Sequence, residues 1–326
     1  MWSYTITNNG VLTNHGQLIT HEDGGHVFNN GTLNNDGVLS SGYVLNYGTV
    51  NNTAGDTSFI VMLNYGTINN SVGATFQTSG GGVYNTGVLT NNGVLIHNGN
   101  ESSSSFEISG TVNGSGTYQQ VATGGGQLPT TIVSGTLSQT AINIHGGSLT
   151  NTGTINGAVT VDQGASLNLS GSTQSGSITN AGSMQIHGTV IQAGSYTQSA
   201  TGSFAVHIGG LLAGSQYDAL NISGTAILDG TLDVSLMDLG GGLFAPHGGD
   251  TFDILTANTL QGSFSALNFP ALLDPNQTWH IDYITDAIGT TDVIRLSVFP
   301  VPIPAAFWLF GSGLVGLLGF MRRRDK

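Results

Sequence analysis

Short apolar stretches alternate with Asn- and Gly-containing corners over the first 200 residues. The phrase Asn-x-Gly-x-apolar begins at Asn8, Asn14, Asn29, Asn35, Asn46, Asn64, Asn85, Asn91, Asn151 and Asn180. Thr, Val, Leu and Ile follow each corner, which is typical of short strands with inward-pointing apolar side chains. Asn and Gly tolerate left-handed backbone conformations, so we expect the corners to use them.

This repetition predicts a right-handed parallel β-helix, a solenoid, over residues 1–202. Strands this short gain stability when each turn of a coil pairs with the next, and we expect turns of roughly 20 residues. Identical residues then stack, so the Asn side chains should form hydrogen-bonded ladders. No Gly-free stretch before residue 300 has a convincing 3.6-residue apolar period, and the predicted fold is therefore all-β.

The pattern changes over residues 203–299. Apolar and polar positions alternate over longer stretches, for example 232–236 and 279–283. Asp229-Gly230 lies between apolar runs and predicts a hairpin turn. We expect 203–299 to be a β-rich module that caps the solenoid, because an uncapped end exposes unpaired backbone.

Residues 300–326 form a third, distinct segment. It opens with a Pro-containing motif: Val301, Pro302, Ile303, Pro304 and Ala305. The run 305–321 is apolar and uncharged, and its 17 residues are at the short end of the roughly 17–25 that cross a bilayer as a helix. It is followed by the cations Arg322, Arg323, Arg324 and Lys326. Cations beside a span stay in the cytoplasm, so the Arg triplet is interpreted as a cytoplasmic stop.

The tail resembles the PEP-CTERM sorting signals of Gram-negative bacteria, in the variant with a Val-Pro-Leu-Pro-Ala motif and with Ile303 in place of Leu. The run 308–314 and the Arg triplet also fit. The resemblance implies cleavage near the motif by an exosortase-type membrane enzyme. It also implies a transient stay in the inner membrane and then release to the cell surface or exopolysaccharide. An ordinary single-span tail anchor is the alternative.

Part of the 203–299 module resembles the C-terminal end of passenger-like bacterial surface proteins. The segments that carry this likeness are 217–224, 228–232, 249–255 and 262–264. The likeness implies a stacked β scaffold and no particular chemistry. An autotransporter would continue into a C-terminal barrel, whereas here the sorting tail follows.

Residues 1–8 have neither the basic segment nor the apolar segment of a signal peptide. Proteins with this kind of tail are normally exported. We therefore expect that a leader was lost from a truncated or misplaced start, with export by another route as the alternative.

Composition excludes several classes of function. Only 7% of the residues are charged, against roughly 25% in ordinary globular proteins. The net charge of −13 argues against nucleic acid as a partner, since a phosphate backbone requires a basic surface. Cysteine is absent, so a disulfide framework and a thiolate site are excluded.

Candidate catalytic groups are sparse, although some β-helices are lyases or glycoside hydrolases. Hydrolysis requires carboxylates roughly 5–10 Å apart. The close acid pairs before Asp218 are Glu22 with Asp23 and Glu101 with Glu107. A lyase requires cationic stabilisation beside its base, yet Arg295 is the one Lys or Arg outside the tail. We therefore expect no enzyme activity and assign no catalytic residue.

Metal ligands are equally weak candidates. Three histidines lie near an acidic pair: His15, His21, His26, Glu22 and Asp23. Without a helical His spacing or paired Cys, we interpret them as solvated turn residues. Asp250 and Asp253 offer at most a weak Ca²⁺ site, because the Gly-rich calcium repeat is missing. We expect no metal and no cofactor.

The combined hypothesis is an exported structural or adhesin-like surface protein, processed by an exosortase and associated with exopolysaccharide or a biofilm matrix. One alternative is a β-helix carbohydrate-active enzyme, a lyase or a glycoside hydrolase. Another is a matrix protein that self-assembles through end-to-end stacking of its Asn ladders.

Overall fold

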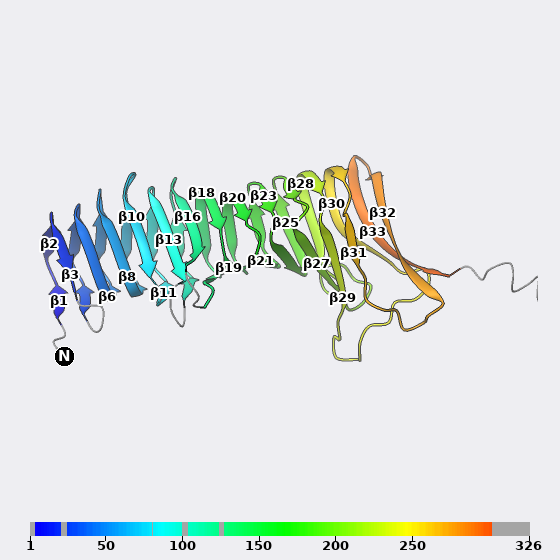
Figure 1. Cartoon of the computed structure of the whole chain (residues 1–326), viewed down its shortest axis with the longest axis horizontal. Helices are drawn as coiled ribbons and strands as arrows, with labels where there is room; N and C mark the ends of the chain where they lie inside the picture. Colours follow the sequence, from blue (N-terminus) through cyan, green and yellow to red (C-terminus); the bar gives the residue numbers. More distant parts are fainter. Residues whose placement is uncertain (1–3, 21–24, 80, 100–103, 124–126, 302–326) are drawn as a thin grey trace, which may run out of the picture.

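The chain forms an all-β solenoid of right-handed type (Figure 1). The computed structural model describes residues 4–20, 25–79, 81–99, 104–123 and 127–301. Within these ranges no helix is present, and none long and apolar enough to cross a membrane is found. The expected span at 305–321 lies outside the described residues.

The strands build three parallel stacks that run the length of the coil. The first stack contains β1 (Thr5–Asn8), β4 (His26–Asn29), β6 (Val38–Asn46), β8 (Asp56–Asn64), β11 (Gly82–Asn85), β14 (Ser105–Ile108), β17 (Thr130–Val133), β19 (Gly147–Asn151), β21 (Ala165–Ser170), β24 (Ser183–His187), β27 (Ser203–Ile208), β29 (Thr231–Leu236) and β31 (Ala266–Asn268). Each strand between β1 and β31 pairs in register with the strand one turn before it and the strand one turn after it.

The second stack contains β2 (Val11–Asn14), β5 (Thr32–Asn35), β7 (Thr49–Asn52), β9 (Thr67–Asn70), β12 (Val88–Asn91), β15 (Thr111–Asn113), β18 (Thr136–Ile144), β20 (Thr154–Val161), β22 (Thr173–Ser175), β25 (Thr189–Ala193), β28 (Ala219–Leu228) and β30 (Thr251–Gly262). The third contains β3 (Gln17–Ile19), β10 (Thr75–Ser79), β13 (Val94–Gly99), β16 (Thr117–Ala122), β23 (Ile178–Asn180) and β26 (Tyr196–Gln198). The long strands β6, β8, β18, β20, β28 and β30 bend from one stack into another.

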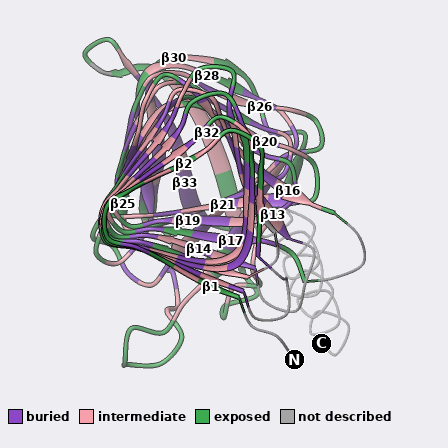
Figure 2. Cartoon of the chain, turned by 90° about the vertical axis from the view of Figure 1, so that its left-hand side faces the viewer, coloured by how far each residue is buried: buried purple, intermediate pink, exposed green. Residues whose placement is uncertain are grey.

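Apolar side chains fill the interior because the same position recurs on every turn. Val27, Val44, Met62, Val83 and Phe106 are successive partners in the first stack, and each is at most 2% exposed. Viewed along the coil, the turns superimpose into one outline with buried positions along its strands (Figure 2). Burying one such side chain contributes about 1.5–3 kcal/mol, so continuous stacks of this kind stabilise the coil without disulfides.

The predicted Asn ladders are present. In the first stack Asn8, Asn29, Asn46 and Asn64 each donate from Nδ2 to Oδ1 of the next Asn, at 2.7–2.8 Å, and Asn85 is the last acceptor of the series. Successive members are 17–21 residues apart, in agreement with turns of roughly 20 residues. From Asn29 onward these amides are fully buried, so the ladder satisfies polar groups inside the coil.

A second ladder follows the corner between the second and third stacks. It comprises Asn14, Asn35, Asn52, Asn70 and Asn91, linked at 2.7–3.0 Å. Most members also donate to a backbone carbonyl of the next turn, as Asn52 does to the carbonyl of Thr75 at 3.0 Å. Both amide protons are therefore used, which explains why Asn recurs at this position.

The repeat glycines serve a purpose other than the one expected. Gly48 and Gly66 do not have positive φ, whereas Gly230 does, at 65°. A Cβ added to Gly66 would lie 2.2 Å from the carbonyl oxygen of Gly48 on the preceding turn. The expectation of left-handed corners is thus wrong for these repeats, because the turns stack too closely there for any side chain.

The parallel pairing continues past residue 202, through β29 to β31. Apart from isolated antiparallel bridges at Ile208–Tyr217 and Asp238–Leu243, antiparallel pairing is made by β33 (Thr291–Pro300), which pairs with β30 and with β32 (Gln277–Ile288). Both strands lie at the opposite end of the coil from β1 (Figure 1). The hairpin predicted at Asp229-Gly230 is wrong, since β28 pairs with β30, and β29 pairs with β27 and β31. This pair is a corner of the coil.

Candidate functional site

The sorting residues lie at or beyond the edge of the described chain. Val301 is the last described residue, is 45% exposed, and donates its N–H to the carbonyl of Asn276 at 2.6 Å. The remaining sorting residues, Pro302, Ile303, Pro304, Ala305, Arg322, Arg323 and Arg324, lie outside the described ranges. Their assignment remains a prediction from the sequence.

The histidines near the N-terminus have separate surroundings. His15 is exposed, and its Nδ1 lies 2.8 Å from the Asp36 carboxylate on the next turn. His26 instead packs between Phe28 and Tyr43, with ring centroids 5.9 and 5.3 Å away. His21, Glu22 and Asp23 fall outside the described residues. The described part of this group therefore consists of a surface pair and a packed ring.

Asp253 forms an ion pair with Arg295, the single Lys or Arg among the described residues. The Arg295 guanidinium donates to both oxygens of Asp253, at 2.6 and 2.9 Å, and this contact raises the pKa of Arg295. Asp282 is the cross-strand neighbour of Arg295 on the other side. Asp250 accepts the backbone N–H of His247 at 2.8 Å. Neither of the carboxylates considered for Ca²⁺ thus stands as an unpaired group on the strand face.

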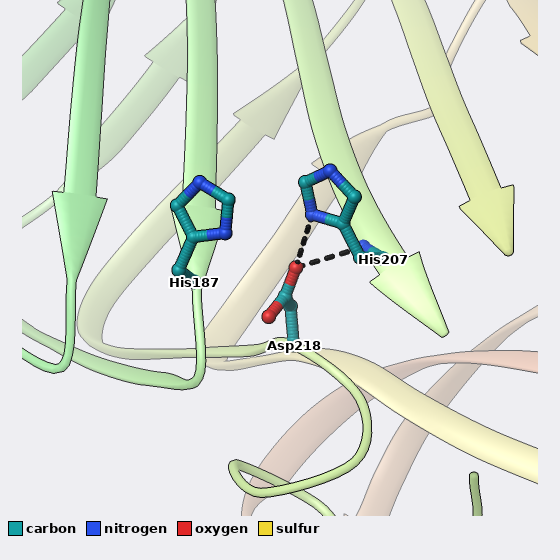
Figure 3. A group of neighbouring side chains, drawn as sticks. All are labelled: His187, His207 and Asp218. Atoms are coloured by element: carbon teal, nitrogen blue, oxygen red, sulfur yellow. Dashed lines mark hydrogen bonds and ion pairs between the residues drawn. The ribbon is translucent and has the colours of Figure 1, made fainter. Parts of the chain in front are cut away.

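A different cluster, His187, His207 and Asp218, brings three potential metal ligands together (Figure 3). One ligand atom from each residue lies within 4.8 Å of the other two. It is the one group of three or more such side chains within the described ranges. Two imidazoles and a carboxylate are donors that suit zinc and similar transition metals.

The stacking of turns creates this cluster. His187 ends β24 and His207 lies near the end of β27, strands that pair in register with Gln185 beside Ala205. Two residues further along both strands, the rings stack, with centroids 4.9 Å apart and planes 12° apart. Asp218 precedes β28, after an excursion over residues 209–217. The chain returns here because Asp218 donates its N–H to the His207 carbonyl at 3.0 Å.

Hydrogen bonds fix the carboxylate of Asp218, which is only 2% exposed. Oδ1 accepts the N–H of Gly188 at 2.7 Å, and Oδ2 accepts the N–H of His207 at 2.8 Å. The ring Nδ1 of His207 also lies 2.8 Å from Oδ2. This hydrogen bond raises the pKa of His207, against the lowering effect of its partial burial.

The sequence did carry one signal for this cluster. His187 and His207 are separated by one period of the coil, so any solenoid in this register places them side by side. The contribution of Asp218 had no such signal, because the inserted loop 209–217 breaks the period.

Comparison with known proteins adds no relative. No family model matches the chain, and no curated protein matches it.

Proposed function

We propose that this chain is an exported, non-enzymatic structural or adhesin-like protein of the bacterial cell surface. Residues 305–321 hold it transiently in the inner membrane, with Arg322, Arg323 and Arg324 on the cytoplasmic side. An exosortase-type enzyme then cleaves near Val301–Ala305 and releases the body to the surface or to exopolysaccharide. The observation that carries this proposal is the order of motif, apolar run and Arg cluster at the C-terminus.

The outer faces of the coil support a structural role. Outward residues form ladders of their own, as in Asn34, Asn51 and Asn69, whose amides are linked at 2.8 Å. Thr32, Thr49 and Thr67 are likewise in register on successive turns. Amides and hydroxyls repeat there at the strand spacing of ~4.8 Å. Such uncharged, hydrogen-bonding rows suit contact with a neutral polysaccharide better than with a charged polymer.

The module 203–299 would then act as the cap. β33 pairs antiparallel with the outer edge of β30, the edge to which a further parallel turn would otherwise be hydrogen-bonded. Asp292, at the start of β33, accepts the N–H groups of Leu260 and Asp286 at 2.7 and 2.9 Å. Both contacts lower the pKa of Asp292. These features favour a closed end and a coil of fixed length.

The test is to express the full chain behind a secretion leader in a Gram-negative host with an exosortase, and in the same host without one. We expect a shortened body at the surface or in the medium only when the enzyme is present. Replacing Pro302 and Pro304 by Ala should leave full-length protein in the inner membrane. Pro275→Ala, in an exposed loop, is the matched control. Full-length protein in both hosts, with no shortened form, would refute the proposal.

A further inference from the structure

The geometry points to a transition-metal site of the zinc class at His187, His207 and Asp218, on the flank of the coil. Its ligands are two imidazole nitrogens from adjacent turns and one carboxylate oxygen from the following corner. The site is independent of the tail and of the proposed sorting.

Distances support an ion of this size. Ligand atoms around a tetrahedral Zn²⁺ with bonds of about 2.0–2.1 Å are roughly 3.3 Å apart. Here Nδ1 of His207 and Oδ2 of Asp218 are 2.8 Å apart, and all three ligand atoms lie within 4.8 Å of one another. Figure 3 shows one ring nitrogen of His187 on the side facing Asp218. An ion between the three ligand atoms would bring these separations to the roughly 3.3 Å of a tetrahedral site.

The surroundings of the ligands are already organised. The backbone N–H groups of Gly188 and His207 hold the Asp218 carboxylate in place. The second ring nitrogen of His207, Nε2, lies 3.0 Å from the side-chain amide of Gln185. A metal on Nδ1 leaves the proton on Nε2, and the Gln185 amide can turn its oxygen to accept it. Metal-bound histidines usually have such a partner for the other nitrogen.

The three residues also belong to different segments, which gives the ion a structural effect. It would connect β24, β27 and the end of the 209–217 excursion. A ligand that binds only this folded arrangement raises the unfolding temperature by mass action. His187 is exposed and leaves the fourth coordination position open to water.

The chain offers a matched control at His145. Its Nδ1 lies 2.8 Å from Asp162, the same pairing as His207 with Asp218, but no second imidazole joins it among the described residues. His145→Gln therefore removes an exposed His–Asp pair without touching the cluster. His187→Gln removes one ligand from an exposed position, and His207→Gln removes the other imidazole.

The experiment is calorimetric titration of the EDTA-treated full chain with ZnCl₂, together with thermal unfolding at each zinc level. We expect one Zn²⁺ per chain, with affinity at least about 100-fold weaker in His187→Gln and His207→Gln and unchanged in His145→Gln. Zinc should raise the unfolding temperature of the unmodified chain and of His145→Gln only. Absence of zinc binding at micromolar concentrations, or equal losses in His187→Gln and His145→Gln, would overturn the inference.

Discussion

Asn64→Ala removes a middle member of the buried ladder and tests the physical basis of the coil. Asn64 is fully buried, and its Nδ2 donates to Asn85 Oδ1 at 2.7 Å and to the Val88 carbonyl at 3.3 Å. Its Oδ1 accepts from Asn46 at 2.8 Å. Alanine therefore leaves two buried groups, one N–H of Asn46 and the Oδ1 of Asn85, without these partners, while the longer bond to the Val88 carbonyl is only part-buried.

The expected loss follows from those two groups. Leaving a buried polar group unsatisfied costs about 1–3 kcal/mol, so two of them give about 4 kcal/mol in unfolding free energy. Asn69 is the matched control, since it lies on the same turn but in the outer ladder. Its Nδ2 donates to Asn51 at 2.8 Å in a half-exposed position. Water replaces that bond, so Asn69→Ala should cost under about 1 kcal/mol.

Urea unfolding followed by far-UV circular dichroism measures both variants, with the unmodified chain alongside. A lower midpoint at unchanged slope reports a change in stability. Amide exchange should also accelerate near Asn46 and Asn85 in Asn64→Ala. If the two variants lose the same stability, the buried ladder is not what holds the turns together.

Three further predictions concern other parts of the coil. Burial lowers the pKa of His97 to about 4. In the unfolded chain the imidazole is protonated below about pH 6.5, whereas in the folded chain it is protonated only near pH 4. The folded state therefore loses stability as the pH falls through this range. Replacing His97 by Gln should remove about 2 kcal/mol of the loss between pH 7.5 and pH 5, measured by urea midpoints. Gly66→Ala should cost about 1–3 kcal/mol in the same assay, whereas Gly10→Ala, with no atom within 4 Å of the added Cβ, should be tolerated. Asp292→Asn should accelerate amide exchange at Leu260 and Asp286 but not at Leu89, and uniform exchange would contradict this role for the carboxylate.

The sequence predicted the coil well because each Asn-x-Gly-x-apolar phrase is a complete local unit. Asn46 and Asn64 begin such units, and the structure pairs them in register. The role of Gly66 does not follow from the sequence, because a glycine required by φ and one required by a neighbouring backbone have the same sequence signature. Asp229-Gly230 has the sequence of a hairpin turn, but a local turn motif does not reveal that the pairing partners of its strands lie one turn away.

The period of the coil is also what creates its side-chain chemistry. His15 contacts Asp36, 21 residues later, and His145 contacts Asp162, 17 residues later, each across one turn. Neither pair forms a local sequence motif, because its two residues are 21 or 17 positions apart and do not share a helix face. In a solenoid the relevant neighbours of a residue lie one turn before and one turn after it. The stack of His187 on His207 follows the same rule, and the loop 209–217 then adds the carboxylate of Asp218 to a pair that the period had already formed.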